Sequence, residues 1–225
     1  MDAAIALADR TDLASVTMRA LAQQVGLSTM ALYGYVPGRA ELVDLMVDRL
    51  YLALPRPALD ELPWADRIRT VADLNRSLFA EHRWLGDTSS ARPPLGPGAS
   101  AKYEYELSAF DGLGLDDVTV DDCLAYLLTF VHGAARAATA VRAAQLETAW
   151  TDQEWWDRHA PLLERVFDAT AYPRAVRIGS AAGHARGSAY DPDQAYEFGL
   201  ARVLAGIAAL LADPTPLSTK PRTLD

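Results

Sequence analysis

Apolar residues recur every three or four positions along most of the chain, and no run alternates apolar and polar residues as a half-buried strand does. In residues 39–50, for example, Leu42, Met46 and Leu50 fall on one side of a helix. The pattern predicts an all-α protein. The expected helices are 2–10, 18–25, 29–35, 39–54, 64–84, 101–111, 120–150, 152–169 and 192–212, and residues 87–100 and 173–190 are expected to be irregular.

Residues at the ends of these segments support the boundaries. Thr17 and Ser28 can each accept a hydrogen bond from a free amide in the first turn of the helix that follows. Gly26 suits the turn between those two helices, because glycine adopts a left-handed backbone without strain. Asp191 followed by Pro192 suits the start of the last helix.

The two short helices joined by a glycine turn at 17–35 have the spacing of a helix-turn-helix, in which the second helix enters the major groove and the first crosses the phosphates. The hydroxyl and guanidinium groups that open the first helix suit phosphate, and the front of the second helix suits base edges. An ordinary helical hairpin would have the same spacing, so spacing alone leaves both readings open. The candidate DNA contacts are Thr17, Arg19, Ser28, Thr29, Met30, Tyr33, Tyr35 and Arg39.

The sequence from Thr17 to Arg39, TMRALAQQVGLSTMALYGYVPGR, followed by ELVDLM at 41–46, resembles the DNA-binding domain of the TetR family of bacterial repressors over residues 5–50. The resemblance implies that the front of the third helix reads bases. It also implies that Thr17, Arg19, Tyr33, Tyr35 and Arg39 hold phosphates. Gly34 departs from the family, which usually has a large polar or aromatic residue there, so one contact is expected to be missing.

A second resemblance, over residues 64–212, is to the ligand-binding and dimerisation domain of the tetracycline-repressor-like branch of that family. It rests on His-Arg-Trp at 82–84, Arg-Pro-Pro-Leu-Gly-Pro at 92–97 and Gly-Leu-Gly-Leu at 112–115, with Arg83 standing where proline is common. Together the two resemblances imply an N-terminal three-helix helix-turn-helix DNA-binding domain at 1–50, a C-terminal helical ligand-binding and dimerisation domain at 51–212, and a tail at 213–225. They imply a transcriptional repressor that binds a palindromic operator on double-stranded DNA as a homodimer and is released by a small-molecule effector.

Aromatic residues of the larger domain could line an apolar pocket with polar handles, beside the small residues 133–138. Each of them could equally be a core or interface residue, and a helical interaction protein without a ligand stays an alternative. The candidate ligand contacts are His82, Trp84, Tyr103, Phe110, Tyr126, Phe130 and Ala134.

A dimer is expected because one helix-turn-helix covers only a few base pairs, and two copies one DNA turn apart give useful specificity. The last helix and the long helix before it are apolar on more than one side, so each could pack on its own chain and on a partner. The candidate interface residues are Leu124, Leu127, Leu128, Val131, Leu200, Val203, Leu204, Ile207 and Leu211.

Composition narrows the class further. The net charge of −9 argues against a protein that coats nucleic acid, although no acid lies between Thr17 and Ala40, where Arg19 and Arg39 stand. The single cysteine, Cys123, leaves no disulfide framework and favours the cytoplasm, and no secretion signal or run of about 18 apolar residues indicates a membrane. The sequence has no motif of a nucleophile, a phosphate-binding loop or a metal site, so we expect neither an enzyme nor a cofactor.

Overall fold

The computed structural model describes residues 1–88, 94–166, 168–188 and 190–213, and every regular element in those ranges is a helix. The elements are α1 (Asp2–Arg10), α2 (Met18–Gln24), α3 (Thr29–Tyr33), α4 (Arg39–Ala53), α5 (Trp64–Glu81), the short 3-10 helix η1 (Arg83–Asp87), α6 (Pro97–Ser108), α7 (Asp117–Thr148), α8 (Asp152–Val166), α9 (Pro173–Arg186) and α10 (Pro192–Ala212). The all-α prediction is confirmed.

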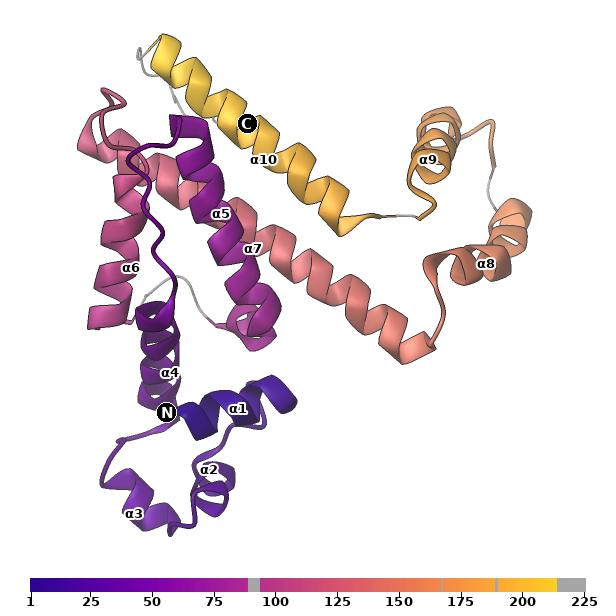
Figure 1. The fold of residues 1–225 in the computed structure, drawn as a ribbon. Helices are drawn as coiled ribbons and strands as arrows, with labels where there is room; N and C mark the ends of the chain where they lie inside the picture. Colours follow the sequence, from indigo (N-terminus) through magenta and orange to yellow (C-terminus); the bar gives the residue numbers. More distant parts are fainter. Residues whose placement is uncertain (89–93, 167, 189, 214–225) are drawn as a thin grey trace, which may run out of the picture.

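Two hydrophobic cores hold the chain together. The first is formed by α1–α4, with Leu42 and Met46 completely buried, and it also takes in Leu78, Trp84 and Leu85 from α5 and η1. The second is formed by α5, α7 and α10 with the end of α6. Figure 1 shows α4 joining these parts, with α1–α3 at one of its ends and α5 and α6 at the other. The first core therefore reaches across residue 50, where the sequence places a domain boundary.

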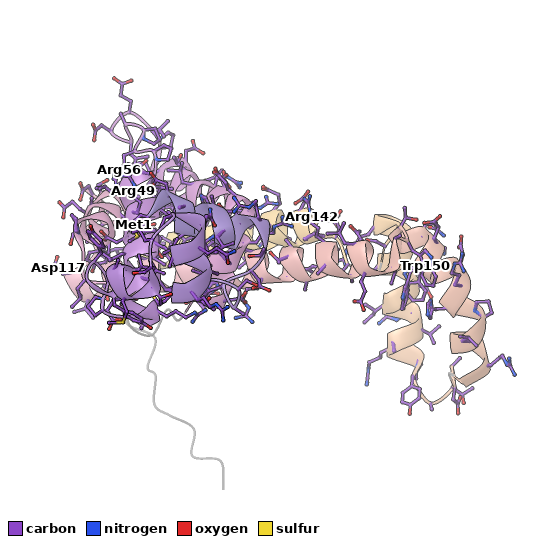
Figure 2. All side chains as sticks on the ribbon, turned by 90° about the horizontal axis from the view of Figure 1, so that it is seen from below. Met1, Arg49, Arg56, Asp117, Arg142 and Trp150 are labelled. Atoms are coloured by element: carbon purple, nitrogen blue, oxygen red, sulfur yellow. The ribbon has the colours of Figure 1, made fainter. Side chains whose placement is uncertain are left out.

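The long helices α7 and α10 run from the second core toward α8 and α9, which lie beyond their far ends (Figure 1). Figure 2 shows this part projecting from the rest of the molecule, with Arg142 and Trp150 on it. By length and composition α7 and α10 could each span a membrane, a weak indication that core helices of soluble proteins also give. Their buried sides pack on each other and on α5 in the second core.

One segment expected to be irregular is a helix. Within 173–190, α9 begins with Pro173 in its first turn and ends at Gly187, whose φ of +66° is left-handed. None of its residues is buried. A helix that buries no face needs no apolar stripe, so the sequence pattern did not predict it. The expected helix at 101–111 also starts earlier, at Pro97, while residues 89–93 of the expected loop lie outside the described residues.

Candidate DNA-binding surface and adjoining cavities

The α2 and α3 helices are capped as the sequence predicts. Thr17 Oγ1 accepts a 3.1 Å hydrogen bond from the amide of Ala20, and Ser28 Oγ accepts one of the same length from Ala31. Gly26, with φ of +70°, makes the turn between the helices. Since each hydroxyl accepts from its own helix, its proton is left to donate to a phosphate.

The outer side of α3 is open to solvent. Leu32 anchors the helix in the first core, whereas Met30 is 80 % exposed and Tyr35, just after the helix, is 78 % exposed. Tyr33 is also exposed, and Thr29 is half-buried at the front of the helix. Large apolar and aromatic side chains exposed on so short a helix have no packing role within the chain, which leaves them free for a ligand surface.

Arginines flank this surface in two different ways. Arg19 on α2 is exposed and has no hydrogen bond or ion pair with any described residue. Arg39, by contrast, donates from Nε to the carbonyl of Val16 at 2.8 Å and from Nη2 to that of Leu13 at 2.6 Å. Part of the guanidinium expected on phosphate therefore holds the segment between α1 and α2, a structural role that the sequence did not indicate.

A cavity of about 500 Å³ lies among α5, the second half of α7 and the start of α10. Its walls include Ala134, Ala138 and Arg142 on α7 and Arg76 on α5. A second cavity, of about 220 Å³, shares Arg83, Ala135 and Thr139 with the first and extends to Gly86 of η1. The larger volume is in the range of pockets that bind drug-sized molecules.

The candidate ligand contacts are not brought together around this cavity. Ala134 lines it, and Phe130 stacks at 5.7 Å on Tyr196, which also lines it. Phe110 is buried in the second core. Tyr103 is exposed and donates to Asp121, and Tyr126 is 63 % exposed. Most of the aromatic candidates therefore lie in the core or on the surface, whereas the small residues at 133–138 correctly indicated the cavity wall.

The remaining two candidates, His82 and Trp84, connect η1 to α1. Trp84 Nε1 donates to Asp9 Oδ1 on α1 at 2.8 Å, and His82 Nδ1 lies 2.9 Å from the same oxygen. On the other side of η1, the carbonyl of Gly86 accepts from Arg136 Nη1 at 3.3 Å. The short helix η1 thus lies between α1 and the cavity wall on α7, and each side is held by polar contacts.

A buried polar cluster lies where α4, α5 and α6 meet. Lys102 Nζ and Asn75 Nδ2 both donate to Glu106 Oε1 at 2.6 Å, and all three side chains are buried. The ammonium is also 5.0 Å from the ring centroid of Tyr51 on α4. Burial, and then the nearby charge of Glu106, raises the pKa of Tyr51 to about 12. These residues, which the sequence did not single out, tie α4 to the larger part of the chain.

The predicted dimer interface needs correction. Leu124, Leu127, Val131, Leu200, Val203 and Ile207 are all buried within a single chain, where α7, α10 and α5 pack together. Leu128, Leu204 and Leu211 are partly buried against the same core. A side chain enclosed in its own core is not available to a partner, so the six buried residues are core residues, while the three partly buried leucines stay predicted interface residues. The outward sides of these helices instead carry Tyr126 and Phe198, 63 % and 67 % exposed.

The chain is similar to known transcriptional regulators. A family model described as "Tetracyclin repressor-like, C-terminal domain" matches residues 56–211. The HTH-type transcriptional repressor DrrR1 of Streptomyces coeruleorubidus is 33 % identical over 214 residues, which are 94 % of this chain and 77 % of that protein. An HTH-type transcriptional regulator of Saccharopolyspora erythraea is 26 % identical over 93 % of this chain and 83 % of its own length.

Solved structures of TetR family proteins have a similar fold. The crystal structure of the Streptomyces coelicolor TetR family protein ActR in complex with actinorhodin has a TM-score of 0.76 and 27 % identity, covering 93 % of this chain and 95 % of its own. The apo structure of ActR has a TM-score of 0.73 at 27 % identity, covering 95 % of this chain and 94 % of its own.

Proposed function

Because the chain belongs to the TetR family of transcriptional regulators, we propose that it is a repressor that binds a palindromic operator on double-stranded DNA as a homodimer and leaves it when a small molecule enters the larger cavity. It regulates transcription rather than catalysing a reaction, and it works in the cytoplasm. Residues 1–50 serve DNA binding, and residues 51–212 serve effector binding and dimerisation.

The observation that carries the proposal is the exposed front of α3. Thr29 and Met30 follow the capping Ser28 on a helix held in place by Leu32, so they are presented rigidly to a major groove. Thr17, Arg19, Tyr33 and Tyr35 surround them with hydroxyl and guanidinium donors for phosphate. Arg39 adds to this set through the donors that the carbonyls of Val16 and Leu13 leave unused.

Effector release is supported by the position of η1 between the cavities and α1. Arg83 and Gly86 of η1 line the smaller cavity, while Trp84 holds Asp9 of α1. A molecule that binds better to one arrangement of η1 shifts the population of the chain toward that arrangement. Because α1 packs with α2 and α4 in the first core, the shift alters the spacing of the two α3 helices in a dimer.

Selection from a pool of random duplexes tests DNA recognition. We expect the enriched sequences to contain two inverted copies of one half-site, centred about one helical turn apart. Met30→Ala should change the preferred bases within each half-site, because the residue lies at the front of α3. A pool that shows no enrichment, or the same consensus for both proteins with an intact fold, would contradict the assignment of α3.

A further inference from the structure

Arginines from three separate elements meet at the larger cavity. Arg76 comes from α5, Arg83 from the start of η1 and Arg142 from the second half of α7. Asp191 and Asp193, at the start of α10, are the acidic residues of the same lining. The formal charge of the lining is therefore +3 − 2 = +1, on a chain whose net charge is −9.

Both acids are already engaged within the chain. Asp193 accepts a hydrogen bond from Arg76, whose guanidinium also lies 4.1 Å from the ring centroid of Tyr196. Asp191 accepts from the backbone amides of Asp193 and Gln194 as the cap of α10. Arg83 and Arg142, in contrast, make no hydrogen bond or ion pair with any described residue. The guanidinium groups of Arg83 and Arg142 are thus left without a paired carboxylate, and the net formal charge of the lining stays +1.

The rest of the wall combines small apolar residues with the polar residues Thr139, Gln145, Ser188 and Tyr190. Ala80, Ala134, Ala135, Ala138 and Val141 form its apolar part, whereas the ring of Tyr196 is buried and already contacts Arg76 and Phe130. Such a wall leaves room for an apolar body, because its side chains are small.

We propose that the effector is an amphipathic anion, with an apolar body and a carboxylate, sulfonate or phosphate group bound by Arg83 and Arg142. The inference rests on the proposed function, since it names the chemical class that the effector cavity takes. Guanidinium groups bind such oxyanions through short, charge-assisted and often paired hydrogen bonds. The unpaired arginines supply the charge, and the alanine wall supplies the apolar contact.

Arg83 also links the charge of the effector to the position of α1. Its chain neighbours His82 and Trp84 both contact Asp9 of α1, and Arg83 lines both cavities. When the guanidinium of Arg83 moves toward an anion in the larger cavity, it also moves His82 and Trp84, which contact α1. A neutral molecule of the same shape fills the cavity without this pull.

Two fluorescent probes with the same ring system test the proposal on the full chain. 1-Anilinonaphthalene-8-sulfonate carries a sulfonate, and N-phenyl-1-naphthylamine is its neutral counterpart. We expect the anion to bind at least about tenfold more tightly, and Arg83→Gln and Arg142→Gln each to weaken it about tenfold while leaving the neutral probe unchanged. Arg10→Gln, which removes the same charge from the exposed end of α1, serves as the matched control and should change neither affinity.

Ala138→Trp, which fills the cavity, should abolish saturable binding of the sulfonate probe, whereas Ala144→Trp on an exposed side of α7 should not. Equal affinity for the two probes, no saturable binding of either, or sulfonate binding that survives Ala138→Trp would each overturn the proposal. Operator binding is measured separately. Its failure beside intact probe selectivity would refute the proposed function alone, and intact operator binding without selectivity would refute the anionic effector alone.

Discussion

The carboxylate of Asp48 on α4 accepts a 2.8 Å hydrogen bond from the backbone amide of Ala99 in the first turn of α6. The helices touch at this point, since a Cβ on Gly98 would lie 1.9 Å from the carbonyl oxygen of Asp48 and 2.8 Å from the amide nitrogen of Leu52. The free amides at the start of α6 favour a negative group, which Asp48 supplies from the neighbouring helix. Glycine at position 98 therefore sets the distance between α4 and α6.

Gly98→Ala should force α4 and α6 apart, because the clash is with backbone atoms that cannot rotate away. We expect the free energy of unfolding to fall by about 1–3 kcal/mol, as for other overpacked sites. Urea denaturation measures the change. Gly179→Ala is the matched control, because Gly179 lies inside α9 with nothing within 4 Å of an added Cβ, and the substitution should stabilise by about 0.5–1 kcal/mol. Equal effects of the two substitutions would mean that α4 and α6 do not touch here.

Removing one partner of the buried pair Lys102–Glu106 should be costly. Glu106→Leu leaves the buried ammonium without its carboxylate, which we expect to lower the free energy of unfolding by about 3–5 kcal/mol. Adding Lys102→Met should recover most of the loss. Arg49→Gln, which breaks the exposed pair with Asp2, should cost no more than about 1 kcal/mol. A Glu106→Leu protein as stable as Arg49→Gln would show that the cluster is hydrated.

Stability should decrease at alkaline pH through Tyr51. Its pKa is about 12 in the folded chain, against an ordinary value of 10.0 for a tyrosine open to water, so the folded state keeps the proton that the unfolded state loses. The contribution is complete below about pH 10 and is lost as the pH rises toward 12. Urea denaturation across this range should show a smaller decrease for Tyr51→Phe than for wild type. Tyr126→Phe, on the surface, is the control, and an unchanged slope for Tyr51→Phe would exclude the effect.

Arg19 and Arg39 should respond differently to substitution. Arg19→Gln removes an exposed charge, so operator affinity should fall similarly for all sequences, and the slope of log affinity against log salt should become smaller by about 1. Arg39→Gln should also lower the thermal midpoint, because it removes the bonds to Val16 and Leu13. Fluorescence anisotropy and thermal unfolding measure the two effects. An unchanged salt slope for Arg19→Gln would remove it from the phosphate contacts.

Phe198→Glu should produce a folded monomer. The side chain is exposed on α10, near Arg202, and has no place in the core of its own chain. In the proposed dimer a charge there would be buried against the partner and would weaken both association and operator binding. Sedimentation velocity measures the oligomeric state. Leu95→Glu, at a fully exposed site before α6, is the control, and a Phe198→Glu protein that stays dimeric would place the interface elsewhere.

The sequence predicted the features that depend only on residues adjacent along the chain. The caps at Thr17 and Ser28 and the helix after Asp191 are local, and they are confirmed. The small residues at 133–138 indicated the cavity, but its arginines were missed because Arg76, Arg83 and Arg142 meet only through tertiary packing. Six of the nine predicted interface residues are core residues instead, for another reason. An apolar stripe such as Leu124–Leu127–Val131 shows that a helix face is buried, but not whether its own chain or a partner covers it.

The two halves of helix α7 have different roles. Its first half, with Leu124 and Leu127, belongs to the second core. In its second half, residues that are not buried line the larger cavity: Ala138, Thr139, Val141, Arg142 and Gln145. A substitution at Ala138 or Arg142 therefore changes what the cavity accepts without disturbing the packing on which folding depends. If the cavity takes the proposed effector, its preference can diverge quickly in evolution, or be redesigned for a biosensor, while the core that holds the fold stays the same.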